Sequence, residues 1–116
     1  MTTPILICDD SGFARKQMAR SIPQDWDVNI SYAANGQEAL DIICSNTIEL
    51  MFLDLNMPIM DGYQTMLNIQ EQQLPVKVIV VSGDVQPEAR RRMMDMGAIE
   101  FIRKPIDNTK LYEILS

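Results

Sequence analysis

Residues 51–62 read MFLDLNMPIMDG, and this stretch decides the fold. The apolar run 50–53 predicts a short buried strand that ends at the carboxylate of Asp54. Pro58 has a fixed φ and no backbone N–H, so the strand must stop, and the Asp-Gly pair at 61–62 can begin a helix. The pattern therefore predicts a strand that delivers Asp54 to a loop. An acid that only caps a turn would look the same locally, so the rest of the chain must decide.

Length and composition indicate one globular domain. The chain has 116 residues, of which 47% are hydrophobic and 22% charged. No apolar run is long enough to span a membrane and no secretory signal is visible, so we expect a cytoplasmic domain. The net charge of −6 argues against direct nucleic-acid binding. The absence of histidine excludes Ser-His-Asp triads, His-ligated zinc and phosphohistidine on this chain.

Four further strands are predicted by hydrophobic pattern. Residues 5–8 and 78–81 are unbroken apolar runs, typical of central strands of a parallel sheet. Residues 28–33 alternate between apolar and polar, and residues 100–103 are flanked by charge, so both are expected at sheet edges. The two cysteines, Cys8 and Cys44, are interpreted as small buried hydrophobic residues and not as a disulfide pair.

Helical patterns separate these strands. They cover residues 11–22, 38–46, 62–71 and 87–96, and a last helix begins at Asn108 or Thr109. Basic side chains on the first and fourth helices are interpreted as solvated surface. Strands that alternate with helices predict an α/β fold, here a flavodoxin-like five-stranded parallel sheet of order 2-1-3-4-5 with five helices on both faces. The residues expected to face the core are Ala14, Met18, Ile22, Leu40, Ile43, Cys44, Tyr63, Met66, Leu67, Ala89, Met93 and Met96, and the residues expected to be solvated are Arg15, Lys16, Arg20, Arg90, Arg91 and Arg92.

Polar side chains follow the central strands. Asp9 and Asp10 end the first strand, and ligands bind at the carboxyl ends of such sheets, between strands one and three. Three carboxylates there, with Asp54, would repel one another unless a cation joined them, and oxygen ligands alone favour Mg²⁺. Ser82 and Lys104 end strands four and five and suit phosphoryl oxygens. The set indicates phosphoryl transfer with Asp54 as the nucleophile.

These motifs resemble the receiver domain of two-component response regulators, over the whole chain and in order. The matching residues are Asp9-Asp10, Asp54 with Asn56-Met57-Pro58 and Met60-Asp61-Gly62 behind it, Ser82-Gly83 and Lys104-Pro105. The resemblance implies a phosphoacceptor switch and not an enzyme with a separate substrate. A sensor histidine kinase would phosphorylate Asp54 from its own phosphohistidine.

The resemblance also implies roles for individual residues. Asp9, Asp10, Asp54 and the backbone carbonyl of Asn56 would hold Mg²⁺. Ser82 and Lys104 would bind the phosphoryl group, Phe101 would be an aromatic switch, and the Lys104-Pro105 peptide would be cis. Ser82 stands where threonine is frequent, and Phe101 where tyrosine is common.

Three other readings remain open. A phosphatase of the haloacid dehalogenase type would need a second Asp two residues after the nucleophile, where this chain has Asn56. A flavodoxin would need a Ser/Thr/Gly phosphate loop after the first strand, where Asp9 and Asp10 would repel anionic flavin mononucleotide. An inactive receiver-like interaction module would not need the complete set of acids.

The last helix leads to a further expectation. From Asn108 it has room for about two turns, with Leu111, Ile114 and Leu115 as its apolar face, and helices this short have little stability of their own. We therefore expect residues 1–116 to be the receiver part of a longer protein with an output domain after Ser116. The surface of the fourth helix, fifth strand and fifth helix would transmit the state of Asp54.

Overall fold

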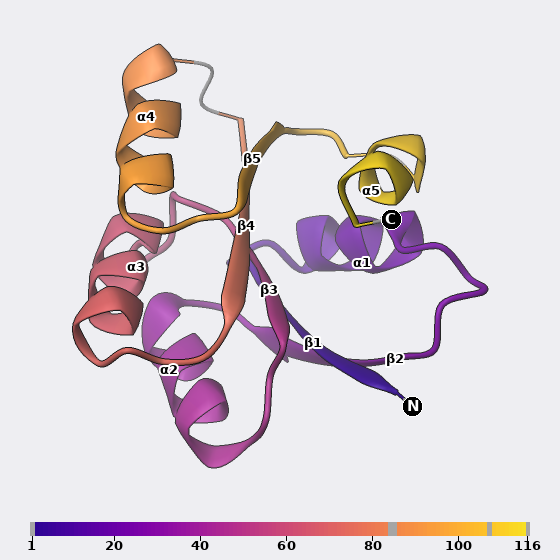
Figure 1. Ribbon diagram of the computed structural model, residues 1–116, viewed down its shortest axis with the longest axis horizontal. Helices are drawn as coiled ribbons and strands as arrows, with labels where there is room; N and C mark the ends of the chain where they lie inside the picture. The colour runs from indigo at the N-terminus through magenta and orange to yellow at the C-terminus, as the bar shows by residue number, and fades with distance from the viewer. Residues whose placement is uncertain (1, 84–85, 107, 116) are drawn as a thin grey trace.

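The computed structural model describes residues 2–83, 86–106 and 108–115 (Figure 1). Within these residues the strands form one parallel sheet in the order β2-β1-β3-β4-β5, as predicted. β1 and β4 begin earlier than expected, because Thr3 and Lys77 already pair with the neighbouring strands. The strands are β1 (Thr3–Cys8), β2 (Val28–Ala33), β3 (Leu50–Leu53), β4 (Lys77–Ser82) and β5 (Glu100–Arg103).

The helices cover both faces of the sheet. Helices α1 and α5 lie on one side, and α2, α3 and α4 lie on the other (Figure 1). None of the helices in the described part of the chain is long and apolar enough to cross a membrane. The helices are α1 (Gly12–Ser21), α2 (Gly36–Ser45), α3 (Gly62–Glu71), α4 (Pro87–Asp95) and α5 (Asn108–Leu115).

Two hydrophobic clusters, one on each face, explain the unbroken apolar strands. Alternate residues of a strand point to opposite faces, so a strand covered on both sides needs apolar residues throughout. In β3, Met51 joins the cluster under α2, α3 and α4, while Phe52 joins the cluster under α1 and α5. Both side chains are at most 2% exposed. The central strands are thereby fixed in register, and their carboxyl ends meet at one edge.

Two residues expected in the core are exposed. Cys44 lies on the surface of α2, and Leu67 of α3 is 46% exposed. Each directly follows a buried residue, Ile43 or Met66, and one step along a helix turns the side chain by about 100°. The buried stripes of both helices are therefore narrower than the sequence pattern indicated. The side chains of Ile114 and Leu115 lie outside the described residues.

Helix α2 begins two residues earlier than predicted. Asn35 caps this helix, because its side chain accepts a hydrogen bond from the backbone N–H of Glu38 at 2.9 Å. Gly36 is therefore the first helical residue. An added Cβ on Gly36 would lie 2.0 Å from the Thr65 hydroxyl oxygen, so glycine lets α2 approach α3 closely.

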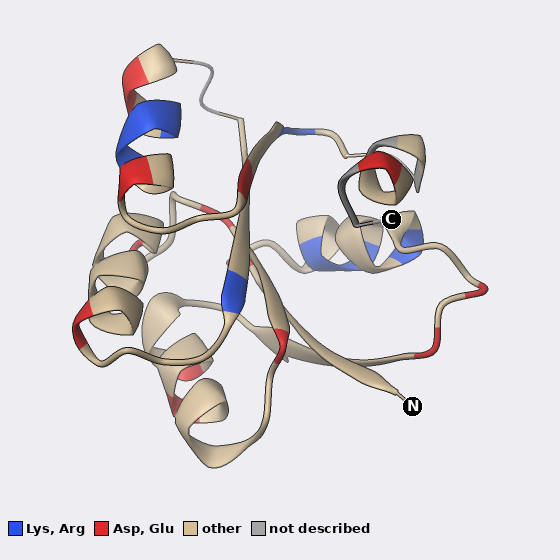
Figure 2. Cartoon of the chain, in the orientation of Figure 1, with Lys and Arg blue, Asp and Glu red and all other residues tan. Residues whose placement is uncertain are grey.

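The arginines of α4 (Figure 2) are exposed, as expected, but they also contact neighbouring side chains. The guanidinium of Arg92 lies 4.1 Å from the ring centroid of Tyr63 on α3. Arg90 pairs with Glu100 of β5 at 3.7 Å. Arg91 is exposed and contacts Glu88 of the same helix. α4 is thus tied to its neighbours on two sides.

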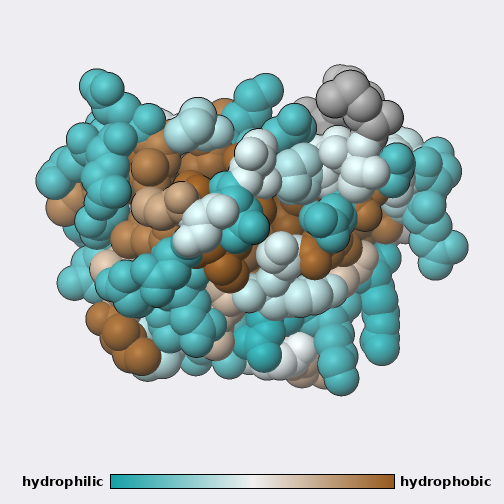
Figure 3. Space-filling view, turned by 90° about the horizontal axis from the view of Figure 1, so that it is seen from below, coloured by the Kyte–Doolittle hydropathy of each residue, from teal (hydrophilic) through white to brown (hydrophobic). Residues whose placement is uncertain are grey.

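The amino ends of the strands form the opposite edge of the sheet. Trp26 lies here, in the connection between α1 and β2, and lines an open groove together with Thr3, Leu50 and Lys77. When the molecule is viewed from below, hydrophobic residues are visible on its surface between hydrophilic ones (Figure 3). Trp26 also packs edge-on against Tyr112 of α5, with the ring centroids 5.4 Å apart. This edge is separate from the one that carries the acids.

Candidate functional site

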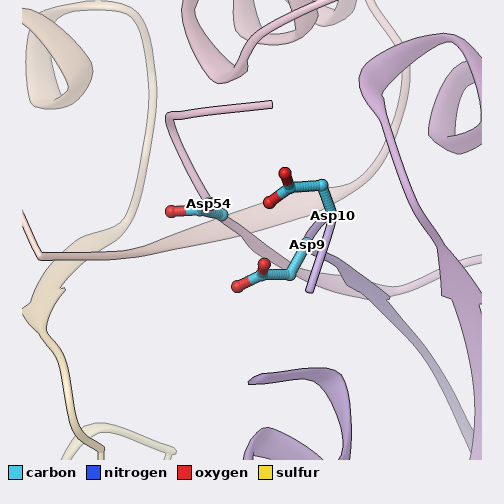
Figure 4. A group of neighbouring side chains, drawn as sticks. All are labelled: Asp9, Asp10 and Asp54. Atoms are coloured by element: carbon cyan, nitrogen blue, oxygen red, sulfur yellow. The ribbon is translucent and has the colours of Figure 1, made fainter. Parts of the chain in front are cut away.

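Three carboxylates meet at the carboxyl ends of β1 and β3. Asp9, Asp10 and Asp54 each offer one oxygen, and these oxygens all lie within 4.8 Å of one another. The side chains point to the same side of the sheet edge (Figure 4). Asp9 and Asp54 are buried, whereas Asp10 is exposed. The backbone N–H of Asp54 bonds to the carbonyl of Cys8 at 3.0 Å, which sets the two acidic segments side by side.

Lys104 brings a positive charge to these acids. Its ammonium nitrogen lies 2.8 Å from Asp9 Oδ2 and 3.5 Å from Asp54 Oδ1. Its backbone N–H bonds to the carbonyl of Ser82 at 2.9 Å, and the Lys104-Pro105 peptide is cis. The sequence placed these three acids and this lysine in one site, and the structure brings them together.

Burial and charge shift the pKa values in this cluster. Burial raises the pKa of Asp54, and the charge of Asp9 raises it further, while Lys104 acts in the opposite direction. Burial alone would lower the pKa of Lys104, but the hydrogen bond to Asp9 and the charges of both acids outweigh it and raise the pKa. The Lys104 ammonium contacts two of the three carboxyl groups, so the three negative charges exceed the one positive charge beside them.

The donor atoms fit a hard divalent cation. Three carboxylates supply oxygen only, which is the ligand type that Mg²⁺ prefers. The neighbouring Cys8 does not offer a thiolate, because burial, and then the charges of Asp9 and Asp54, raises the pKa of its thiol to about 12. A softer metal that requires sulfur is therefore not favoured here.

The first turn of α1 holds the Asp9-Asp10 segment. The backbone N–H of Ser11 bonds to Asp9 Oδ1 at 3.0 Å, and the Ser11 hydroxyl accepts from Ala14 N–H to cap the helix. Arg15 was expected to be solvated, but it is half-buried and donates to the carbonyl of Asp9 at 2.7 Å. Because the acceptor is a backbone carbonyl, no pattern of residue types in the sequence indicated this contact.

The loop that follows Asp54 is closely packed. Gly62 N–H bonds to the carbonyl of Leu55 at 2.9 Å, and a Cβ on Gly62 would lie 2.6 Å from the Asp54 carbonyl oxygen. Ile59 has φ of 69°, a left-handed conformation that is rare for a β-branched residue. Asn56 lies in the exposed part of this loop, two residues after Asp54. The loop is thus held in one shape directly beside the acid.

Ser82 and Phe101 belong to β4 and β5, on the side of β3 opposite to β1. Ser82 is fully buried at the end of β4, the strand that pairs with β3. Phe101 is half-buried in β5 and packs against the cluster under α2, α3 and α4. Asp84, the next polar residue after this strand, lies outside the described residues. The predicted acids, Ser82 and Lys104 thus lie at or just after the carboxyl ends of four neighbouring strands, whereas Phe101 lies within β5.

The family model for the response regulator receiver domain matches residues 5–116. The chain belongs to the response regulator receiver domain family. Its flavodoxin-like sheet with strand order 2-1-3-4-5 agrees with this family. Receiver domains are phosphoacceptor switches and generally bind Mg²⁺ in an acidic pocket.

Individual relatives agree with this membership. A protein-glutamate methylesterase/protein-glutamine glutaminase 1 of Syntrophomonas wolfei is 35% identical over 114 residues, covering 97% of this receiver domain and 32% of that protein. An uncharacterized response regulatory protein of Shewanella oneidensis is 34% identical, with 95% and 46% covered. The CheX-CheY-BeF3-Mg²⁺ complex of Borrelia burgdorferi has a TM-score of 0.88 at 33% identity, with 97% and 86% covered. The receiver domain thus spans a third to a half of the length of these two curated relatives.

Proposed function

We propose that this receiver domain accepts a phosphoryl group on Asp54 from the phosphohistidine of a sensor histidine kinase. The observation that carries the proposal is the convergence of the carboxylates of Asp9, Asp10 and Asp54 with the ammonium of Lys104. An oxygen of Asp54 forms a bond to phosphorus while the phosphorus–nitrogen bond breaks, and the imidazole leaves with the electron pair. The domain would catalyse only its own phosphorylation and dephosphorylation.

The metal ligands in this proposal are Asp9, Asp10, Asp54 and the backbone carbonyl of Asn56. An Mg²⁺ ion there would supply positive charge that offsets the negative charge of the phosphoryl oxygens. The protein's own part is to hold these oxygens at the sheet edge before the reaction, as the buried Asp9 and the Ser11 N–H do. Pre-arranged ligands of this kind lower the cost of reaching the transition state.

Lys104 and Ser82 are assigned to the phosphoryl group. The Lys104 ammonium lies close enough to Asp54 to meet a phosphoryl oxygen bonded to that side chain. Ser82 would donate its hydroxyl from the end of β4. Phe101 is half-buried, and we propose that its rotamer follows the state of Ser82. Such a change would reach the surface formed by α4, β5 and α5, where an output domain or partner protein would read it.

Incubation with Mg²⁺ and acetyl phosphate tests the proposal. Intact mass spectrometry should show one added phosphoryl group on the wild type and none on Asp54→Asn. Labelling of Asp54→Asn at the wild-type rate would refute the assignment. An inactive interaction module would not be labelled, a phosphatase of the haloacid dehalogenase type would release phosphate with repeated turnover, and a flavodoxin would bind flavin mononucleotide instead.

A further inference from the structure

The segment that carries Lys104 is tied to its surroundings at both ends. We call residues 104–106 the lysine loop. At its start the Lys104 N–H bonds to the Ser82 carbonyl, which joins the loop to β4. At its end the carbonyl of Ile106 accepts a hydrogen bond from the hydroxyl of Ser21 at 3.1 Å. The loop is therefore fixed between the sheet and α1.

Ser21 is an unusual residue to find at this place. It is the last residue of α1 and is only 7% exposed. Its hydroxyl oxygen lies 2.9 Å from the Gln17 carbonyl, one helical turn earlier, and 3.1 Å from the Ile106 carbonyl. A hydroxyl has a single proton, so these two acceptors share or exchange it. A buried hydroxyl that reaches across 85 positions of the sequence joins α1 to the lysine loop.

Close packing alone does not hold the lysine loop. A small hollow of about 30 Å³ lies between α1 and the loop, bordered by Gln17 and Met18 on one side and by Pro105 and Ile106 on the other. Asp54 and Lys104 line the same hollow. Although Ile106 itself is buried, a hollow of this size leaves the loop some freedom for small movements, which close packing on every side would not. The hydrogen bond from Ser21 is thus a direct restraint on the loop at this side.

We infer that Ser21 is a positioning residue, which holds the lysine loop so that the Lys104 ammonium stays within reach of Asp9 and Asp54. Ser21 touches neither acid. It acts on the Ile106 carbonyl, two residues after Lys104. Without the hydroxyl this buried carbonyl loses a donor, and a buried carbonyl without a partner turns toward water. The hollow allows a small movement of this kind, and the ammonium moves with the loop.

Three variants separate this role from general loosening of the fold. Ser21→Ala removes the hydroxyl, and Ser21→Thr keeps it. Ser21→Cys keeps the shape of serine with a weaker donor, in case the methyl group of threonine does not fit. Tyr112→Phe is the matched control, because the Tyr112 hydroxyl also joins α5 to the α1–β2 connection, through Asp25 at 2.6 Å, but does not touch the lysine loop.

The first measurement needs no phosphorylation. The ammonium of Lys104 is observed by nitrogen-15 NMR and assigned by its absence in Lys104→Met. In the wild type and Tyr112→Phe, the hydrogen bond to Asp9 should protect its protons from exchange with water. In Ser21→Ala the exchange should be at least tenfold faster, with return toward the wild-type rate in Ser21→Thr or Ser21→Cys. An unchanged exchange rate in Ser21→Ala would overturn the inference.

The second measurement rests on the proposed function. With saturating acetyl phosphate and Mg²⁺, Ser21→Ala should be phosphorylated about tenfold more slowly per folded molecule, because a misplaced group lowers the rate of a positioned reaction. The Mg²⁺ dissociation constant from calorimetry should not increase, since the acids keep their positions and a displaced ammonium repels the ion less. An equal loss of rate in Tyr112→Phe would overturn the positioning role. If the wild type itself is not phosphorylated, the proposed function fails, while the exchange measurement still decides the role of Ser21.

Discussion

Replacing Ile59 with asparagine should stabilise the receiver domain. Ile59 lies in the loop after Asp54 with φ of 69°, and its side chain is 81% exposed. The left-handed region costs an ordinary L-residue roughly 1–2 kcal/mol, and a β-branched side chain fits it poorly. Asparagine adopts this region far more readily because its short polar side chain bonds locally. The backbone of Ile59 is therefore strained, and burial of its side chain does not compensate for that strain.

The size of the gain follows from two opposing contributions. Relief of the backbone cost contributes about 1 kcal/mol. Full burial of an isoleucine side chain is worth about 1.5–3 kcal/mol, and only a fifth of this side chain is buried, so the loss is about 0.5 kcal/mol. The free energy of unfolding should therefore rise by about 0.5 kcal/mol, and Tm by about 2 °C. Ile59→Gly should gain less, because glycine adds freedom to the unfolded chain.

Urea and thermal unfolding of the metal-free protein measure this gain. Phe13→Asn is the matched control, because Phe13 is 73% exposed but lies in α1 with helical backbone. It removes an exposed apolar side chain without relieving strain, so it should not stabilise the domain. The reasoning would be refuted if Ile59→Asn were no more stable than the wild type, or if Phe13→Asn stabilised the domain equally.

Four other predictions concern the site and its surroundings. Gly62→Ala should lower the free energy of unfolding by about 2 kcal/mol in urea titrations, because its Cβ would meet the backbone of Asp54 at 2.6 Å, whereas Gly83→Ala, with open space around its Cβ, should change it little. The Cys8 thiol has a folded pKa of about 12 against an ordinary 9.0, so its contribution to stability is complete below pH 9 and is lost as pH rises through 12. Unfolding above pH 9 should therefore depend less steeply on pH in Cys8→Ala than in the wild type. Asp54→Asn should raise the stability of the metal-free domain at neutral pH, because burial raises the pKa of this carboxyl and its charge is unfavourable; the gain should vanish at a pH where the carboxyl is protonated in both folded and unfolded chains. Mg²⁺ should leave the fluorescence of Trp26 almost unchanged, because Trp26 lies at the amino ends of the strands, and strong quenching that saturates with Mg²⁺ would contradict this.

Hydrophobic pattern was sufficient to predict the sheet. The runs at 5–8, 50–53 and 78–81 have apolar residues at every position, and only a strand covered on both faces needs that. Because the acids directly follow two of these runs, the same argument placed Asp9 and Asp54 together. The order of the strands and the convergence of the carboxylates could therefore be predicted from the local hydrophobic pattern and the positions of the acids.

Features that depend on distant contacts were not predictable in this way. Cys44 and Leu67 fit an apolar helical stripe within the accuracy of the pattern, and only the packing of α2 and α3 decides which residues lie outside it. Arg15 looked like a solvated arginine because its acceptor is a backbone carbonyl, which no residue type reveals. The hydroxyl of Ser21 finds its second acceptor in a loop 85 residues away. Such contacts arise from tertiary structure and produce no periodic pattern in the sequence.

The acidic edge and the core have opposite effects on stability. The raised pKa of Asp54 indicates that its charge is unfavourable in the metal-free domain, and Lys104 compensates for only part of it. Any cation that binds the folded acids and not the unfolded chain must therefore add stability, in proportion to the logarithm of its concentration above the dissociation constant. The buried apolar residues of the sheet stabilise the fold and offset this unfavourable charge. In Asp54→Asn the unfavourable charge and the response to Mg²⁺ should decrease together, because one carboxylate is the source of both.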